Sequence, residues 1–345
     1  MSSGGLDSPV DPLLGSPGLV RHFLCRIGIT VIGGLALVSG QTPALTPAQT
    51  DPRFRPAFAP GTGPMVAIDE AHRNRQTLSS PSFRALRDRL GADGYRLRSL
   101  AEPISRASMS GIDVLLISGP GGWFTPDESL TDGEVASLME WIGQGGSLLL
   151  VLDHMPEPRN ARRLLSSLGI THWHNGYAMV DMPNAAPLGN IIFWRSKFLP
   201  KGAPPIGPTG PGGGTGYQGD DAVLESHVIT EGRSTDERVQ RVATFVGSAF
   251  QPPSGAVALL RMPLRAISLV PEETPGRLPV FTAETPRITV GGWLQGAVMT
   301  VGRGRVAVFG ESGLFSAGPA ADNRQFVLNV MHWLSNLLQG GTDAR

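Results

Sequence analysis

The chain has 345 residues, of which 41% are hydrophobic and 17% are charged, so it carries enough apolar side chains for a folded core and lacks the composition of a disordered protein. Its 29 lysine and arginine residues balance 29 aspartate and glutamate residues. This balance excludes the strong basic field that draws proteins to nucleic acid, and we expect no nucleic-acid partner.

The first 50 residues resemble a secretory signal. Arg21, His22 and Arg26 precede an apolar run at residues 27–38, and small residues suited to signal-peptidase cleavage follow at 42–48. We therefore predict a signal peptide at residues 1–50, which would place the protein in the periplasm or outside the cell. The alternative is a membrane tether formed by a retained N-terminal anchor, although the apolar run is short and interrupted for a membrane span.

The single cysteine, Cys25, lies within this predicted signal. Removal of the signal would leave a mature protein without a thiol, which excludes both a disulfide and a cysteine nucleophile. Residues 51–63 are rich in proline and glycine, and they predict a linker into the folded domain.

Strands and helices alternate along the first half of the domain. Residues 146–152 form an apolar run bounded by glycine, which is typical of a strand buried on both faces. Thr131 and Glu134 have the spacing of a capping box and predict the start of a helix. The predicted strands cover residues 65–68, 95–100, 113–118 and 146–152, and the predicted helices begin near residues 80, 131 and 160. This alternation predicts a parallel sheet with right-handed crossovers.

The second half of the chain has a weaker pattern. Residues 182–222 contain a glycine- and proline-rich run that predicts an inserted flexible loop or lid. Further predicted elements are strands at 242–250, 256–262 and 266–270, a hairpin at 292–309 and a C-terminal helix at 323–338. The predicted fold class is α/β, with a mostly parallel central sheet sandwiched by helices and antiparallel additions in the C-terminal half. All of it belongs to one predicted domain at residues 64–340.

Ionisable residues follow three of the predicted strands. They are Asp69, Glu70 and His72 after the first strand, Asp153 and His154 after the central strand, and Glu311 with Ser312 after the last. Because the carboxyl ends of parallel strands open on one edge of a sheet, we expect these side chains to converge on a site. The candidate catalytic residues are Asp153, His154, Glu311 and Glu70. Asp69 and His72 are candidate ligands for a divalent metal, a possible cofactor.

Five residues are candidates for binding a substrate, and they are Gly119, Pro120, Asn74, His227 and Ser312. The glycine-rich segment 119–122 follows a predicted strand and could cradle an anion through its backbone N–H groups. It lacks the Gly-Lys-Ser/Thr of a P-loop and the spacing of a dinucleotide fingerprint, so a nucleotide site is not favoured.

Each candidate also has a structural interpretation. Asp69 and Asp153 are equally suited to capping the turn or helix that follows their strand. The histidines, including His227, are consistent with hydrogen-bonded residues that brace loops. Glu311 is consistent with an ion pair to an arginine such as Arg303 or Arg324. Convergence of several candidates at one edge is what favours a functional site.

The chain resembles the class I glutamine amidotransferase-like superfamily, which is flavodoxin-like, over about residues 64–340. The resemblance rests on the strand and Gly-Pro-Gly-Gly loop at 113–122, the strand ending in Asp153-His154, and the late segment Arg305-Val-Ala-Val-Phe-Gly-Glu-Ser. In that family the second strand leads to a catalytic cysteine, and a late Phe-His-Pro-Glu supplies histidine and glutamate. Here Asp153 or His154 stands at the cysteine position and the late histidine is absent. The resemblance is to an exported branch without the nucleophile, which excludes glutamine hydrolysis through a thioester.

Three functions are compatible with these residues. The leading hypothesis is a hydrolase of a small or carbohydrate-like substrate that uses the Asp/His/Glu site, with a carboxylate or a metal-bound water in place of the thiol. The second is a non-catalytic module that recognises a sugar, a peptide or an envelope partner through the same edge. The third is an auxiliary subunit of an envelope transport system. Fold alone does not decide among them.

Overall fold

The computed structural model describes residues 54–122, 128–180, 192–196, 223–244, 246–272, 281–282, 284–315 and 322–339. The predicted signal peptide at residues 1–50 lies outside the described residues, as does most of the predicted loop at 182–222. In the described ranges, no helix combines the length and the apolar character that crossing a membrane requires.

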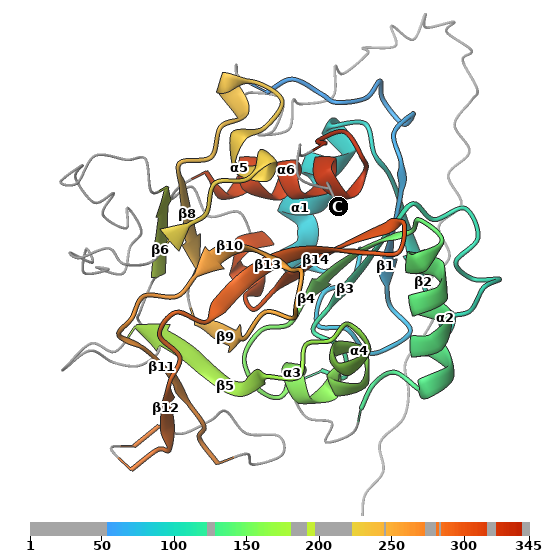
Figure 1. The fold of residues 1–345 in the computed structure, drawn as a ribbon. Helices are drawn as coiled ribbons and strands as arrows, with labels where there is room; N and C mark the ends of the chain where they lie inside the picture. The colour runs from blue at the N-terminus through green and yellow to red at the C-terminus, as the bar shows by residue number, and fades with distance from the viewer. Residues whose placement is uncertain are drawn as a thin grey trace, which may run out of the picture. The chain divides into compact units, whose positions relative to one another are not determined.

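A mixed β-sheet forms the centre of the domain (Figure 1). Its parallel half consists of β1 (Met65–Asp69), β2 (Arg96–Leu100), β3 (Val114–Ser118), β4 (Ser147–Val151) and β14 (Gly304–Phe309). These strands lie in the order β14-β4-β3-β1-β2, and each neighbouring pair is parallel. The predicted α/β class with a parallel sheet in the first half is therefore confirmed.

The second half of the sheet is mainly antiparallel. It consists of β5 (Trp173–Val180), β6 (Ile192–Ser196), β7 (Val223–Leu224), β8 (Arg241–Thr244), β9 (Gly247–Phe250), β10 (Val257–Arg261), β11 (Ala266–Leu269), β12 (Arg287–Thr289) and β13 (Leu294–Val301). The predicted hairpin is present, because β13 pairs antiparallel with β14 along six residues of register. It joins the two halves of the sheet.

Both faces of the parallel strands are buried, which explains their continuous apolar sequences. In β4, Leu149 and Val151 face one hydrophobic cluster, whereas Leu148 and Leu150 face the other. The first cluster contains side chains from α1 (Arg84–Ala92) and α6 (Asn323–Leu334), and the second contains side chains from α2 (Asp132–Gly143) and α4 (Arg162–Ser167). Figure 1 shows the same helix–sheet–helix layering. The predicted sandwich follows from this period-two alternation.

The helices begin and end where local chemistry satisfies their backbone. Thr131 Oγ1 accepts a hydrogen bond from the Glu134 N–H at the start of α2, and the Glu134 carboxylate accepts one from the Thr131 N–H. The predicted capping box is therefore present. At the far end of α6, Arg305 donates to the carbonyls of Trp333 at 2.6 Å and Leu338 at 3.0 Å. Arg305 is only 8% exposed, and its guanidinium lies 5.0 Å from the Trp333 ring centroid. These contacts explain how a charged residue occupies the second position of the buried strand β14.

Three elements differ from the expectations. Residues 54–63, predicted as part of a linker, belong to the domain, because Phe58 N–H donates to Asp93 O and Gly63 N–H to Gly94 O. The predicted strand at 242–250 is two strands, β8 and β9, which pair with different neighbours. Strand β6 lies inside the segment predicted as a loop, and it pairs antiparallel with β8. In the first and third cases backbone pairing with distant residues overrides a surrounding composition rich in glycine or proline.

Truncation of Leu150 tests the packing of the central strand. Leu150 is fully buried, so we expect Leu150→Ala to lower the free energy of unfolding by about 2–5 kcal/mol, since methyl groups are lost and a cavity remains. Denaturant unfolding followed by circular dichroism measures the change. The matched control is Leu264→Ala, whose side chain is 72% exposed and whose loss should cost less than about 0.5 kcal/mol. Equal effects at the two positions would contradict the placement of β4.

Candidate functional site

The carboxyl ends of β1, β3, β4 and β14 lie at the same edge of the sheet. Val151, the last residue of β4, pairs with Ser118 of β3 and with Phe309 of β14. The residues that follow these strands meet there, because Ser312 Oγ donates a hydrogen bond of 2.6 Å to the Asp153 carboxylate. The predicted convergence of the strand ends is thus confirmed for this pair, which is 159 residues apart in sequence.

Arg75 is the central residue of this edge, and the sequence pattern did not reveal it. Its Nη2 donates to the Asp153 carboxylate and, at 2.6 Å, to Ser312 Oγ. Its Nε lies 3.3 Å from Glu157 Oε1. Burial by itself lowers the pKa of Arg75, but the attraction of Asp153, Glu157 and Glu311 outweighs burial and raises it. Its only sequence signal is its position directly after Asn74, a candidate binding residue.

Asp153 lies two residues beyond the end of β4, and it is 5% exposed. Its Oδ1 accepts the His154 N–H at 2.9 Å, and its Oδ2 accepts Ser312 Oγ and Arg75. Burial by itself raises the pKa of Asp153, but the Arg75 charge and these hydrogen bonds lower it below the usual value. The side chain is therefore an ionised carboxylate whose two oxygens already hold three hydrogen bonds.

Glu157, at the start of α3 (Glu157–Asn160), is a second buried carboxyl that the sequence pattern did not reveal. Its Oε2 accepts the Asp153 N–H at 2.6 Å, and the side chain is 1% exposed. Burial raises the pKa of Glu157, and the nearby Asp153 charge adds to that increase, whereas Arg75 opposes it. The net effect raises the pKa of Glu157, whereas the same surroundings lower the pKa of the neighbouring Asp153.

His154 follows Asp153 in the sequence, and its ring packs against an aromatic residue. Its ring stacks on Tyr177, with centroids 4.2 Å apart and planes inclined by 18°. Its Nδ1 lies 2.9 Å from the Met155 carbonyl oxygen. Burial lowers the pKa of His154, and Asp153 opposes this effect only in part. The imidazole is therefore neutral at pH 7, with Nδ1–H donating to Met155.

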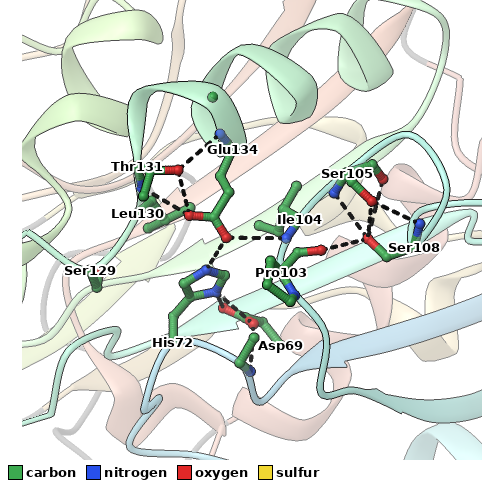
Figure 2. A network of polar contacts seen from close by, with 12 residues as sticks. Asp69, His72, Pro103, Ile104, Ser105, Ser108, Ser129, Leu130, Thr131 and Glu134 are labelled. Carbon is green, nitrogen blue, oxygen red and sulfur yellow. Dashed lines mark hydrogen bonds and ion pairs between the residues drawn. The ribbon is translucent and has the colours of Figure 1, made fainter.

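A second network joins the end of β1 to α2 (Figure 2). His72 Nδ1 contacts both oxygens of Asp69 at 2.8 and 2.9 Å, and its Nε2 lies 2.7 Å from Glu134 Oε1. Burial by itself lowers the pKa of His72, but the two carboxylates outweigh it and raise the pKa to about 9. Burial likewise opposes ionisation of Glu134, yet Thr131 and His72 lower its pKa to about 2. His72 is thus a buried imidazolium held between two carboxylates.

This network bears on the candidate metal ligands Asp69 and His72. Both ring nitrogens of His72 already contact carboxylates, and Asp69 also accepts the Ala71 N–H and the Asn74 amide. Among the residues that the structure describes, no group of three or more histidine, cysteine or carboxylate side chains has an arrangement able to hold a metal ion. Asn74 completes the brace, since its Oδ1 accepts the Ser118 N–H at 3.1 Å.

The glycine-rich loop after β3 lies against Glu157. Gly119 has a φ of +64°, and a Cβ at this position would come within 2.8 Å of Glu157 Oε1, so glycine is required. Two of the backbone amides expected to bind an anion already have partners, because Gly119 N–H donates to Val151 O and Gly121 N–H donates to His72 O. The prediction of an anion site is therefore wrong for these two amides. Asn160 binds the carbonyls of Pro120 and Gly122. The loop closes the edge of the sheet over α3.

The remaining candidates are placed as follows. Glu70 accepts the Leu78 N–H at 2.7 Å and so braces the segment before α1. Glu311 is 3% exposed, accepts the Gly313 N–H at 2.6 Å, and acts on the charge of Arg75. The alternative partner Arg303 instead donates to the Gln144 carbonyl. Glu311 therefore joins the edge, as expected.

His227 does not join the other candidates. Its Nδ1 accepts the Ile229 N–H at 3.2 Å and caps α5 (Val228–Glu231). Its ring centroid lies 6.1 Å from that of Trp333, the residue over which Arg305 packs at the start of β14. The structure thus places His227 at the amino end of the parallel strands, away from Asp153. The cap and the Trp333 contact agree with the bracing interpretation.

Comparison with known proteins gives a likeness of fold. No protein-family model matches the chain, and no curated protein matches it. The mmIFT52 N-terminal domain is 17% identical, with a TM-score of 0.52, over 78% of this chain and 97% of that one. A ThuA-like protein from Bacteroides uniformis is 10% identical, with a TM-score of 0.43, over 81% and 95% of the two chains. A GMP synthase component from Thermoplasma acidophilum is 10% identical, with a TM-score of 0.38, over 80% and 96%. At these identities the comparisons show a likeness of fold alone.

Substitution of His72 tests the buried imidazolium. We expect His72→Gln to lower the free energy of unfolding by about 3 kcal/mol near neutral pH, because Asp69 is left as a buried carboxylate without its cation. The folded pKa of about 9 exceeds the usual 6.5, so the folded state binds more protons between these values. Stability from His72 is therefore complete below about pH 6.5 and is lost as pH rises through about 9.

Denaturant unfolding of the full chain across this pH range measures the effect. The loss of stability with rising pH should be smaller in His72→Gln than in the wild type. The control is His172→Gln, since His172 is exposed and its side chain hydrogen-bonds only its neighbour Thr171 in the described contacts. A wild-type profile that stays flat from pH 6.5 to 9 would contradict the imidazolium.

Proposed function

We propose that this protein is a non-catalytic binding module built on an amidotransferase-like α/β fold. The observation that carries the proposal is the state of Asp153, which is, with His154, one of the two residues that the resemblance sets at the nucleophile position. Its two oxygens accept hydrogen bonds from His154 N–H, Ser312 Oγ and Arg75, and the side chain is 5% exposed. A nucleophile or general base needs a lone pair that faces substrate. Asp153 instead uses its lone pairs to hold the strand ends together.

The neighbouring carboxylates support the same interpretation. Asp69 accepts hydrogen bonds from His72, Asn74 and the Ala71 N–H and has no exposed surface. Glu157 lies beneath Gly119 and is 1% exposed. These acids contribute to the architecture of the edge, and a substrate would have to displace structural hydrogen bonds to reach them.

The exposed groups at this edge indicate the ligand class. The Arg75 side chain keeps 21% of its surface exposed, and the partly buried ring of His154 stacks on Tyr177. The Tyr177 and Phe281 rings meet edge to face, with their centroids 5.1 Å apart. A charged hydrogen-bond donor beside an aromatic stack suits a small polar ligand with both hydroxyl and apolar faces. We therefore propose a carbohydrate-like ligand. The signal-like first 50 residues favour export and an envelope partner, or tethering of the module to the membrane.

A hydrolase is the second candidate, and one observation favours it. The pKa of Glu157 is raised by burial and that of His154 is lowered by burial, and such opposed shifts are typical of acid/base pairs. Burial of Glu157 argues against it, because an acid must reach the leaving group.

An activity screen with an Asp153→Asn control separates the two functions. We expect the full chain to show no turnover of nitrophenyl glycosides, nitrophenyl esters or glutamine above the background reaction, with wild type and variant indistinguishable. Circular dichroism confirms that both are folded. Turnover by the wild type that falls by a factor of about 100 or more in Asp153→Asn would establish a catalytic carboxylate and overturn the proposal.

Titration calorimetry with glucose, galactose, mannose and N-acetylglucosamine tests the ligand class. We expect at least one sugar to bind the wild type and to bind His154→Ala about ten-fold more weakly, because the ring that carries the apolar contact is lost. His172→Ala is the matched control on an exposed strand end and should bind like the wild type. Absence of binding by all four sugars would remove the carbohydrate-like ligand from the proposal.

A further inference from the structure

Two buried carboxyl groups at the sheet edge share one guanidinium. Asp153 is 5% exposed and Glu157 is 1% exposed, and both contact Arg75. Glu311 also acts on the charge of Arg75 from the end of β14. Arg75, Asp153, Glu157 and Glu311 are called the ion cluster below. Ionisation of every acid in it would leave more negative than positive charge around carboxyl groups that are almost fully buried, which is costly.

The hydrogen bonds show which acid keeps its charge. Asp153 accepts donors on both oxygens, from His154 N–H, Ser312 Oγ and Arg75 Nη2. Glu157 accepts one, on Oε2, from the Asp153 N–H. Its Oε1 has no hydrogen-bond partner in the described part of the chain, and Arg75 Nε lies 3.3 Å away from it. The stronger set of donors stabilises the Asp153 carboxylate and leaves the Glu157 carboxyl as the group that takes up a proton.

We propose that the ion cluster holds one proton on Glu157 in the folded protein at neutral pH, and that this proton makes the sheet edge an alkali-sensitive latch. The Glu157 carboxyl ties the first turn of α3 to the end of β4 through the Asp153 N–H. It also fills the space beneath Gly119, where even a Cβ would come within 2.8 Å of Oε1. A second negative charge in this space draws in water and loosens the contact between α3, β4 and the loop after β3.

The groups that face Glu157 fix the direction of the effect. Asp153 disfavours its ionised form and Arg75 favours it, whereas Glu311 acts on the charge of Arg75, and His154, beside Asp153, is neutral at pH 7. The loop at residues 119–122 carries no ionisable side chain. The folded pKa of about 8 lies above the usual 4.5, so the folded state binds the extra proton between these values. Stability from this group is therefore highest below about pH 4.5 and falls as pH rises to about 8.

Glu157→Gln keeps the shape of the side chain and removes the titration. We expect unfolding of the full chain, measured with denaturant between about pH 5 and pH 9, to show that the wild type takes up about one more proton on folding than the variant near pH 6.5. His72 contributes equally to both proteins and cancels in the difference. Glu102→Gln is the control, because Glu102 is exposed, and it should follow the wild type. Identical pH profiles for wild type and Glu157→Gln would overturn the proposal.

A second measurement applies even where Glu157→Gln does not fold. Carbon-13 NMR of glutamate-labelled wild-type protein should show one side-chain carboxyl with a pKa of about 8, well above the usual value for glutamate. In Asp153→Asn this titration should move to lower pH, because a neighbouring negative charge is removed. Titration of every glutamate carboxyl below about pH 6 would overturn the proposal. None of these readouts depends on a bound ligand, so they stand apart from the test of the binding function.

Discussion

The contact between Arg75 and Asp153 is the constraint on which the carboxyl edge of the sheet depends. It joins the segment after β1 to the end of β4, and through Ser312 it reaches the segment after β14. Strands β1 and β14 do not pair with each other, since β3 and β4 lie between them. A buried ion pair adds little net stability, because desolvation offsets most of the Coulombic attraction. Its contribution here is geometric, since it fixes the segments after β1, β4 and β14 relative to one another.

This constraint explains why the edge is built from polar residues and yet is closed. Parallel strands end with unpaired carbonyl and N–H groups, and side chains from neighbouring loops satisfy them. Gly119 N–H binds the Val151 carbonyl, Ser118 N–H binds Asn74, and Asp153 N–H binds Glu157. A catalytic edge would leave some of these groups facing substrate. The carboxylates here are used for connecting loops, which is the physical basis for preferring a binding role to catalysis.

Much of the fold could be predicted from sequence, because its signals are local. The apolar run of β4 reports burial on both faces, and the capping box of Thr131 and Glu134 reports the start of α2. Convergence of the strand ends followed from parallel topology alone. Arg75 and Glu157 could not be recognised in the same way. Their roles depend on Asp153, which is 78 residues from Arg75, and an arginine in a loop has no local pattern that reports burial.

His72 shows that local sequence also could not decide the role of a residue that it did identify. His72 was a plausible metal ligand because histidine near carboxylates is typical of metal sites. Whether such a histidine binds metal or carries a proton depends on the partner of its second nitrogen. That partner, Glu134, is 62 residues away and also belongs to the cap of α2. The local sequence around His72 therefore could not show that both of its ring nitrogens contact carboxylates.

The two networks at this edge solve one electrostatic problem in opposite ways. At His72, two carboxylates surround a group that can gain a proton, and burial is tolerated because the histidine becomes a cation. At Arg75 the cation is permanent and carboxyl groups outnumber it, so protonation of one acid lowers the excess of negative charge. Both networks bind a proton more tightly in the folded state than in the unfolded state. Proton binding therefore stabilises both the His72 network and the Arg75 network, and rising pH weakens both of them.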